Sequence, residues 1–145
     1  MDQYFEANAV LSVFSKRYME LKKGLPIRLS EMGVLNIITH TPGPHSSVML
    51  AELTGVSKPM ITAHITSLAE KGYAVKEQSK EDKRVYYIFP TDKALELVDS
   101  ARKEMDSHLS WLMEVLGQED FDALIRLAKK AGEVLREQRE QQIDQ

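Results

Sequence analysis

The chain contains no cysteine among its 145 residues. This absence excludes disulfides, thiolate metal sites and any cysteine nucleophile or redox switch. Long apolar runs are missing as well, because the longest uncharged stretch, Met32 to Ala51, is interrupted by Pro42, Gly43 and Pro44. Such a stretch cannot form a continuous membrane helix, so we expect no membrane partner.

The start of the chain lacks the marks of a secretory signal. Asp2 and Glu6 stand where a signal peptide is basic, and no short apolar core leads to a small-residue cleavage site. Hydrophobic residues make up 43% and charged residues 28% of the sequence, which is ordinary for a globular protein. We therefore expect a cytoplasmic protein in which residues 1–145 form a single unit.

Motifs of catalysis are also missing. The sequence has no phosphate-binding glycine loop, no G-x-S-x-G elbow and no pair of carboxylates that spacing identifies. Its histidines, at positions 40, 45, 64 and 108, fall on separate segments without an H-x-x-x-H pair. We predict no enzymatic activity, no cofactor and no metal site.

The charge is close to balanced, whereas proteins that bind nucleic acid often have basic domains. The formal net charge is −3, but residues 45–90 carry 6 basic and 5 acidic side chains, against 13 and 17 in the remainder. The middle of the chain is therefore mildly basic relative to its flanks. This distribution permits DNA binding without demonstrating it.

Both ends of the chain have helical periodicity. Apolar residues recur three or four positions apart over residues 4–25, and Gly24 with Pro26 ends this helix. Its apolar surface is broader than one stripe, which indicates an interface. Thr91 is expected to cap a long helix that closes at Gly117, and a final helix follows at once.

Three further helices are expected between these ends. Ser30 can cap the first of them, which residues 41–44 end. Ser46 or Ser47 caps the next, and Ser57 caps the third.

The stretch 50–61 has the spacing of a helix-turn-helix. Leu50 and Leu53 are expected to face inward, and Gly55 permits the backbone conformation of the turn. The outward face of the second helix presents short or polar side chains that can reach phosphates and base edges in a major groove. These side chains are Lys58, Thr62, His64, Thr66 and Ser67.

After Gly72 the period of the pattern changes to two. Aromatic and β-branched residues alternate from Val85 to Phe89, and residues 73–78 can pair with them across the polar segment 79–84. The resulting hairpin is longer than a tight two-residue turn, so it should protrude.

On these motifs the sequence resembles the MarR family of regulators over nearly its whole length. The resemblance implies a mainly α fold with a small β-hairpin wing, in which a winged helix-turn-helix over residues 30–90 is flanked by dimerisation helices over residues 1–25 and 91–145. It also implies that Arg84 enters the minor groove while Asp82 holds it in place. The matching residues are Leu50-Ala51, Gly55-Val56-Ser57, Ile61-Thr62, Leu68, Lys71-Gly72, Asp82-x-Arg84 and Thr91-x-Lys93.

The residues and the resemblance together predict a DNA-contacting set on the second helix of the motif and on the wing. The set is Ser57, Lys58, Pro59, Thr62, Ala63, His64, Thr66, Ser67, Lys76, Lys80, Asp82, Lys83 and Arg84.

Three positions depart from the pattern of the family. Ala63 stands where relatives often have a basic or polar residue, so weaker or different base readout is expected there. Pro90 replaces the usual leucine at the end of the wing strand, and Ala94 replaces the usual glycine in the following helix. The last two changes concern geometry rather than chemistry.

The lack of cysteine excludes the thiol-sensing branch of the family. Two alternatives remain, a small aromatic or other organic effector, or no effector at all. An effector pocket is predicted around Phe14, Tyr18, His40 and Trp111. Aromatic residues at helical spacing are more often plain core or dimer packing.

We therefore predict a transcriptional regulator that binds a pseudo-palindromic operator in double-stranded DNA as a homodimer. We further expect it to repress a nearby operon and to be released by a small-molecule effector. The alternative is a winged-helix protein-interaction module without specific DNA binding, which would suit the acidic balance. The two differ in an observable way, because DNA binding through Arg84, Lys58 and Lys76 must weaken steeply with salt.

Overall fold

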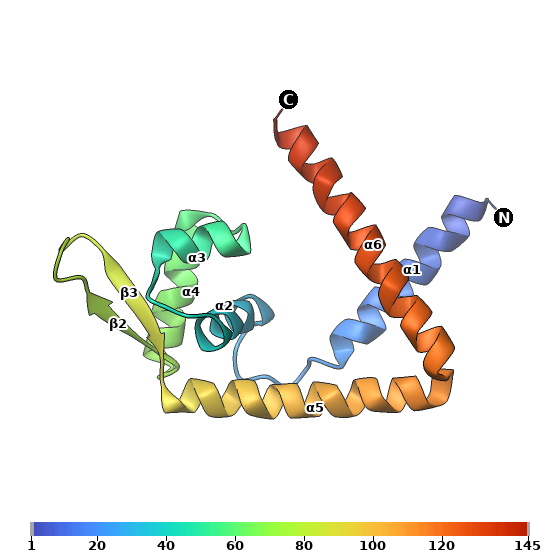
Figure 1. Cartoon of the computed structure of the whole chain (residues 1–145), viewed down its shortest axis with the longest axis horizontal. Coiled ribbons are helices and arrows are strands. Elements are labelled where there is room, and N and C mark those ends of the chain that lie inside the picture. Colours follow the sequence, from blue (N-terminus) through green and yellow to red (C-terminus); the bar gives the residue numbers. More distant parts are fainter. Residues whose placement is uncertain (1, 145) are drawn as a thin grey trace. The chain divides into compact units, whose positions relative to one another are not determined.

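The computed structural model describes residues 2–144. In this range the chain is mainly helical, with a small three-stranded antiparallel sheet (Figure 1). This architecture confirms the predicted fold class. The elements are α1 (Gln3–Glu20), α2 (Leu29–His40), β1 (His45–Ser46), α3 (Ser47–Thr54), α4 (Lys58–Glu70), β2 (Ala74–Gln78), β3 (Tyr86–Pro90), α5 (Asp92–Leu116) and α6 (Gln118–Ile143).

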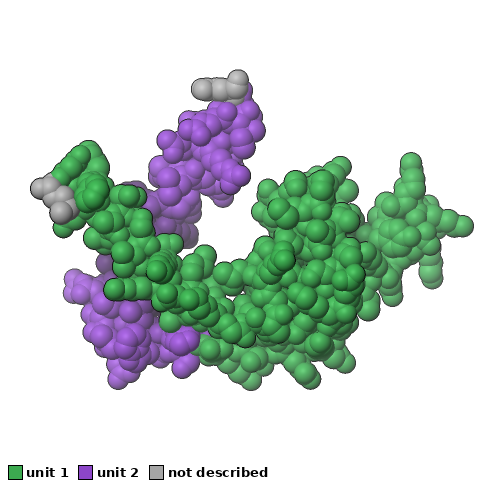
Figure 2. All heavy atoms as spheres, turned by 180° about the vertical axis from the view of Figure 1, so that it is seen from behind, with its two compact units in different colours: residues 1–104 green, residues 105–145 purple. Residues whose placement is uncertain are grey.

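The chain divides into two compact units, residues 1–104 and residues 105–145 (Figure 2). The first unit contains the elements from α1 to β3 and the first half of α5. The second unit contains the rest of α5 and α6. Among the described residues, no helix combines the length and the apolar character needed to span a bilayer.

One hydrophobic core holds the first unit together. Side chains of α2, α3, α4, the sheet and the start of α5 pack in it, and Leu35, Leu50, Ile61 and Leu68 are completely buried. Full burial of such a side chain stabilises the fold by roughly 1.5–3 kcal/mol. The core therefore fixes α3 and α4 against α2 and leaves their outer faces to solvent.

Caps and one turn set the limits of the helix-turn-helix. Of the two serines predicted to cap α3, Ser46 does so, because its Oγ accepts the backbone N–H of Met49 at 3.2 Å. Ser57 caps α4 as predicted, and its Oγ accepts the N–H of Met60 at 3.3 Å. Between the helices Gly55 has a φ of 71°, a left-handed conformation that costs a residue with a Cβ about 1–2 kcal/mol.

The prediction that Leu53 faces inward is wrong. Leu50 and Ala51 are buried and define the inward face of α3, whereas Leu53 is exposed. At about 3.6 residues per turn, Leu53 lies too far around the helix from the direction shared by the two buried residues.

The start of α2 also differs from the prediction. Ser30 lies inside the first turn, and Arg28 occupies the N-cap position. Glu31 is buried, and its Oε1 accepts the Arg28 N–H at 3.1 Å and lies 3.4 Å from Nζ of Lys71. Burial by itself raises the pKa of Glu31, but hydrogen bonds from Ser67 and Arg28 and the charge of Lys71 together lower it below its ordinary value. Glu31 thus ties the start of α2 to the end of α4.

The sheet has the strand order β1-β3-β2, with both pairs antiparallel. Val75 pairs with Phe89 and Glu77 with Tyr87 in the predicted hairpin, which extends away from α2, α3 and α4 (Figure 1). On the other edge of β3, strand β1 was not predicted, because two residues are too short for an alternating pattern to be visible.

Contacts from the start of α5 fasten the base of the hairpin. Thr91 caps α5, and its Oγ1 also donates to the Gly72 carbonyl at 2.7 Å. Lys93 Nζ donates to the Lys71 carbonyl at 2.7 Å and lies 4.5 Å from the centre of the Tyr73 ring. The end of α4, the base of the wing and the first turn of α5 are therefore linked directly.

Candidate nucleic-acid interface

The outer face of α4 is the first part of the candidate interface. Because Ile61, Ile65 and Leu68 turn into the core, the residues between them in the helical period must face solvent. The exposed residues are those predicted to contact DNA at the beginning and centre of the helix. They are Ser57, Lys58, Pro59, Thr62, Ala63 and Thr66.

Two residues predicted on this face lie elsewhere. His64 is only 7% exposed, because it shares the inward direction of Ile61 and Ile65, and it therefore cannot present a donor to DNA in this conformation. Ser67 is half-buried, and it is one of the groups that lower the pKa of Glu31. His64 is therefore removed from the predicted contact face, and Ser67 is only partly available on it.

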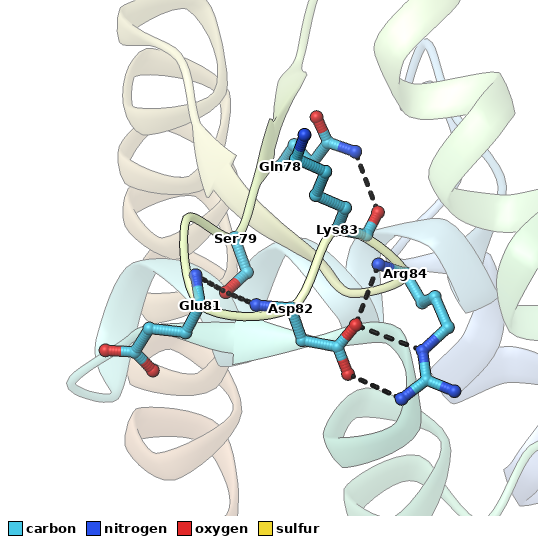
Figure 3. A network of polar contacts seen from close by, with 6 residues as sticks. All are labelled: Gln78, Ser79, Glu81, Asp82, Lys83 and Arg84. Atoms are coloured by element: carbon cyan, nitrogen blue, oxygen red, sulfur yellow. Dashed lines mark hydrogen bonds and ion pairs between the residues drawn. The ribbon is translucent and has the colours of Figure 1, made fainter.

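The Asp82 and Arg84 side chains form the second part of the interface, at the tip of the wing (Figure 3). Asp82 Oδ1 accepts both the backbone N–H of Arg84 at 3.0 Å and its Nε–H at 3.1 Å. Asp82 Oδ2 accepts from Arg84 Nη2 at 3.1 Å. Paired, charge-assisted bonds of this kind fix the direction of a guanidinium group as well as its position.

The arginine of this pair remains available to a ligand. Its side chain is 89% exposed, whereas that of Asp82 is 42% exposed. Hydrogen bonds from the Arg84 side chain and backbone lower the pKa of Asp82 below its ordinary value, so the carboxylate stays charged at neutral pH. Arg84 is therefore a cation that its pairing with Asp82 orients on the surface.

The turn that carries this pair has its own supports. Ser79 is buried, and its Oγ accepts the N–H groups of Glu81 and Asp82, both at 3.3 Å (Figure 3). Gln78 Nε2 donates to the Lys83 carbonyl at 2.7 Å across the turn. These bonds stabilise the conformation of the loop that presents the arginine.

Further exposed charges surround the tip. The lysines predicted to reach phosphates are all exposed, and the acidic residues Glu77 and Glu81 alternate with them on the same hairpin. The wing therefore offers separated positive charges rather than a continuous basic patch. These lysines are Lys76, Lys80 and Lys83.

The residues predicted to line an effector pocket lie on different elements. Phe14 and Tyr18 stack on α1 with ring centroids 6.2 Å apart. His40 is exposed at the end of α2, where its Nδ1 lies 2.9 Å from the Asn36 carbonyl oxygen, and Trp111 belongs to the second unit. A separate hollow of about 380 Å³ in the first unit is lined by Lys16, Met19, Glu20, Lys22, Lys23, Gly24, Leu25, Ile27 and Leu29.

Two residues of the site region escaped the sequence reasoning. Met60 is 53% exposed in the first turn of α4, beside the predicted contact face. Only its place three residues after the Ser57 cap could have indicated this exposure. Glu31 accepts the N–H of Arg28 at the local spacing of a capping box, which could have indicated its role, whereas its other partner Lys71 lies forty residues away in the sequence.

Comparisons with known proteins agree with this geometry. Residues 23–85 match the model of the MarR family. The uncharacterized HTH-type transcriptional regulator YkoM of Bacillus subtilis is 30% identical over 103 residues, which cover 71% of this chain and 66%, just under two thirds, of that protein.

Solved structures share the fold. FabT of Streptococcus pneumoniae, in a complex with DNA, superposes with a TM-score of 0.79 at 16% identity, over 94% of this chain and 99% of that one. PcaV of Streptomyces coelicolor, in a complex with its natural ligand, gives a TM-score of 0.72 at 15% identity, over 92% and 96% of the two chains. The family match places residues 23–85 in the MarR family, and the regulator homologue and the winged-helix architecture agree with this assignment.

Proposed function

We propose that this protein regulates transcription by binding a pseudo-palindromic DNA operator as a homodimer. In this proposal α4 enters the major groove and the wing reaches the adjacent minor groove. The observation that carries it is the Asp82–Arg84 pair at the tip of a protruding hairpin, in which two hydrogen bonds hold an exposed guanidinium and a third holds the Arg84 backbone N–H. A purely structural ion pair would gain little from such exposure, because surface pairs contribute only about 0–1 kcal/mol.

The chemistry of both parts of the candidate interface, α4 and the wing, suits double-stranded DNA. A narrow minor groove concentrates negative potential and attracts an inserted arginine. The start of a capped helix can present short side chains to base edges in the major groove. The DNA complex of FabT, which shares this fold, supports the proposal.

Dimerisation is proposed from the unpartnered apolar side chains outside the helix-turn-helix. Exposed apolar patches of this extent are unusual in a monomer, and a two-fold pair would bury them. In α1 they are Tyr4, Phe5, Val10 and Leu11, and in the second unit they include Trp111, Val115, Val134 and Leu135. Sedimentation at micromolar concentration should give twice 16.5 kDa, and a monomer that stays folded on dilution would contradict this part of the proposal.

Repression and release by a small organic effector complete the proposal. Two half-sites lie about 34–36 Å apart along the duplex, so a ligand that alters the separation of the two α4 helices would weaken binding. The ligand complex of PcaV supports an effector role in proteins of this fold. A ligand that binds tightly and leaves operator affinity unchanged would show that its pocket does not regulate DNA binding.

The experiment that tests DNA binding uses the full-length protein and duplexes enriched from a randomised pool. We expect one enriched sequence with two-fold symmetry, bound at least about 1,000 times more tightly than random duplex. The logarithm of its affinity should fall linearly with the logarithm of salt concentration. Retention of all duplexes with equal affinity, or of none, would favour the protein-interaction module instead.

A further inference from the structure

The chemistry of α4 has a consequence for the kind of base that it reads. Between Ser57 and Glu70 the sequence has no arginine, asparagine or glutamine. Those side chains make the bidentate hydrogen bonds that distinguish guanine and adenine in the major groove. In this stretch Lys58 is the one side chain with a permanent positive charge.

Most of the remaining polar groups on α4 are already hydrogen-bonded or at least partly buried. The Thr62 hydroxyl donates to the Lys58 carbonyl at 2.9 Å, and the Ser57 hydroxyl accepts the Met60 N–H. His64 is buried, and Ser67 is half-buried.

What the outer face offers instead is a row of methyl and methylene groups. Ala63 and the methyl-bearing Thr62 are exposed side by side, with Thr66 one turn further along. Pro59 is exposed one turn before them, and the flexible thioether of Met60 is 53% exposed beside them. Small apolar groups of this kind contact the C5-methyl group of thymine, which projects into the major groove.

We infer that α4 reads thymine methyl groups, with Thr62 and Ala63 as the specificity-determining residues. This inference rests on the proposed DNA-binding function and adds the class of base that the operator must present. The half-sites therefore contain thymine at one or two positions facing these residues. The missing polar group at Ala63 changes the readout from hydrogen bonding to apolar contact.

The test removes single methyl groups from the DNA. Each thymine of the enriched duplex is replaced in turn by deoxyuridine, which pairs identically but lacks the methyl group. Binding is followed by fluorescence anisotropy at one fixed salt concentration. At the contacted positions we expect Kd to rise about fourfold per methyl group, and about fifteenfold when both half-sites are changed together.

Matched protein variants locate the contact. Thr62→Ser keeps the hydroxyl that bonds to the Lys58 carbonyl but removes the methyl group, so the Kd ratio between deoxyuridine and thymine should fall towards one at one position. Thr54→Ser is the control, because the Thr54 hydroxyl likewise bonds four residues back, to the Leu50 carbonyl at 2.7 Å, but lies on α3. This control should keep the full ratio. Ala63→Gly should bring the Kd ratio between the deoxyuridine and thymine duplexes to one at a second thymine position.

Different failures have different meanings. If an enriched sequence exists but every deoxyuridine duplex binds within twofold of its thymine parent, the inference is wrong and the DNA-binding function stands. Loss of binding on replacing a half-site guanine by 7-deazaguanine, with no deoxyuridine effect, would also overturn it, because Lys58 would then be the reader. If no sequence is enriched, the proposed function fails together with the inference.

Discussion

Replacing Glu31 by glutamine should destabilise the first unit by removing one buried charge. The Glu31 side chain is 1% exposed, and its Oε1 both accepts the Arg28 N–H and faces Nζ of Lys71. Glutamine retains a carbonyl oxygen for the N–H, so the cap of α2 survives. What is lost is the charge-assisted part of the contact with Lys71.

The magnitude follows from the difference between two kinds of hydrogen bond. A bond to a charged group contributes roughly 1.5–3 kcal/mol and a neutral one roughly 0.5–1.5 kcal/mol. Because the Lys71 side chain is 42% exposed and partly screened by water, we expect the lower part of that difference, about 1 kcal/mol. Glu31→Ala also removes the bond to the Arg28 N–H, which adds about 1 kcal/mol. The control is Glu20→Gln, which breaks the exposed pair with Lys23 and should change stability by less than about 0.5 kcal/mol.

The pH dependence of the stability difference between wild type and Glu31→Gln distinguishes loss of the Glu31 charge from a change in packing. The folded-state pKa of Glu31 lies below its ordinary value of 4.5. Its contribution to stability is therefore fully present above that value and is lost as pH falls through the folded-state pKa. The stability difference between wild type and Glu31→Gln should be largest at neutral pH and should shrink below about pH 4.5.

Urea unfolding followed by circular dichroism at one protein concentration measures this difference. Wild type, Glu31→Gln and Glu20→Gln are compared from pH 7 down to the lowest pH at which all three fold. A difference that stays constant or grows as pH falls would refute the assigned role of the Glu31 charge.

Three other sites, the Asp82–Arg84 pair, Gly55 and Gly33, give further predictions. Arg84→Ala should weaken operator binding by about 1–3 kcal/mol and reduce the salt slope by roughly one unit if a phosphate contact is also lost, as measured by titrations at several salt concentrations. Asp82→Ala removes a negative charge near DNA, yet it should weaken binding in the same assay because the arginine loses its orientation; tighter binding with fold and dimer intact would mean that Asp82 is only a turn residue. Gly55→Ala should cost about 1–2 kcal/mol in urea unfolding, because no side chain or backbone atom lies near the added Cβ and only the φ of 71° opposes it. Gly33→Ala, inside α2 and equally unobstructed, should instead stabilise by about 0.5–1 kcal/mol, so that equal effects at the two glycines would contradict the backbone argument.

Much of the fold could be predicted from local patterns. Helix caps such as Ser57, the turn at Gly55 and the alternation from Val85 to Phe89 each act over a few residues, so the sequence displays them directly. The Asp82–Arg84 pair is different, because only the resemblance to the MarR family implies it. The structure places all of these as expected.

Two predictions that were wrong concern the direction of His64 and the cap of α2. His64 has a polar side chain that suggested an outward position, but the helical period set by Ile61 and Ile65 places it inward. The cap of α2 is local, because Glu31 accepts the N–H of Arg28, but Ser30 offered a competing cap in the sequence. The contact between Glu31 and Lys71, by contrast, joins residues distant in the sequence. Such features depend on which faces pack together, and a single sequence does not display that directly.

The central claim, that duplex DNA contacts α4 and the wing together, can be measured directly because the chain has no cysteine. A single thiol introduced by Glu70→Cys on α4 or Lys83→Cys on the wing carries a DNA-cleaving iron chelate at one known place. Lys129→Cys, on α6 in the second unit, is the control. We predict that the chelates at 70 and 83 cleave the enriched duplex at discrete positions related by two-fold symmetry, and that the chelate at 129 does not. Cleavage from 129 as strong as from the other two, or no localised cleavage from 70 and 83 on a bound duplex, would contradict the proposed interface.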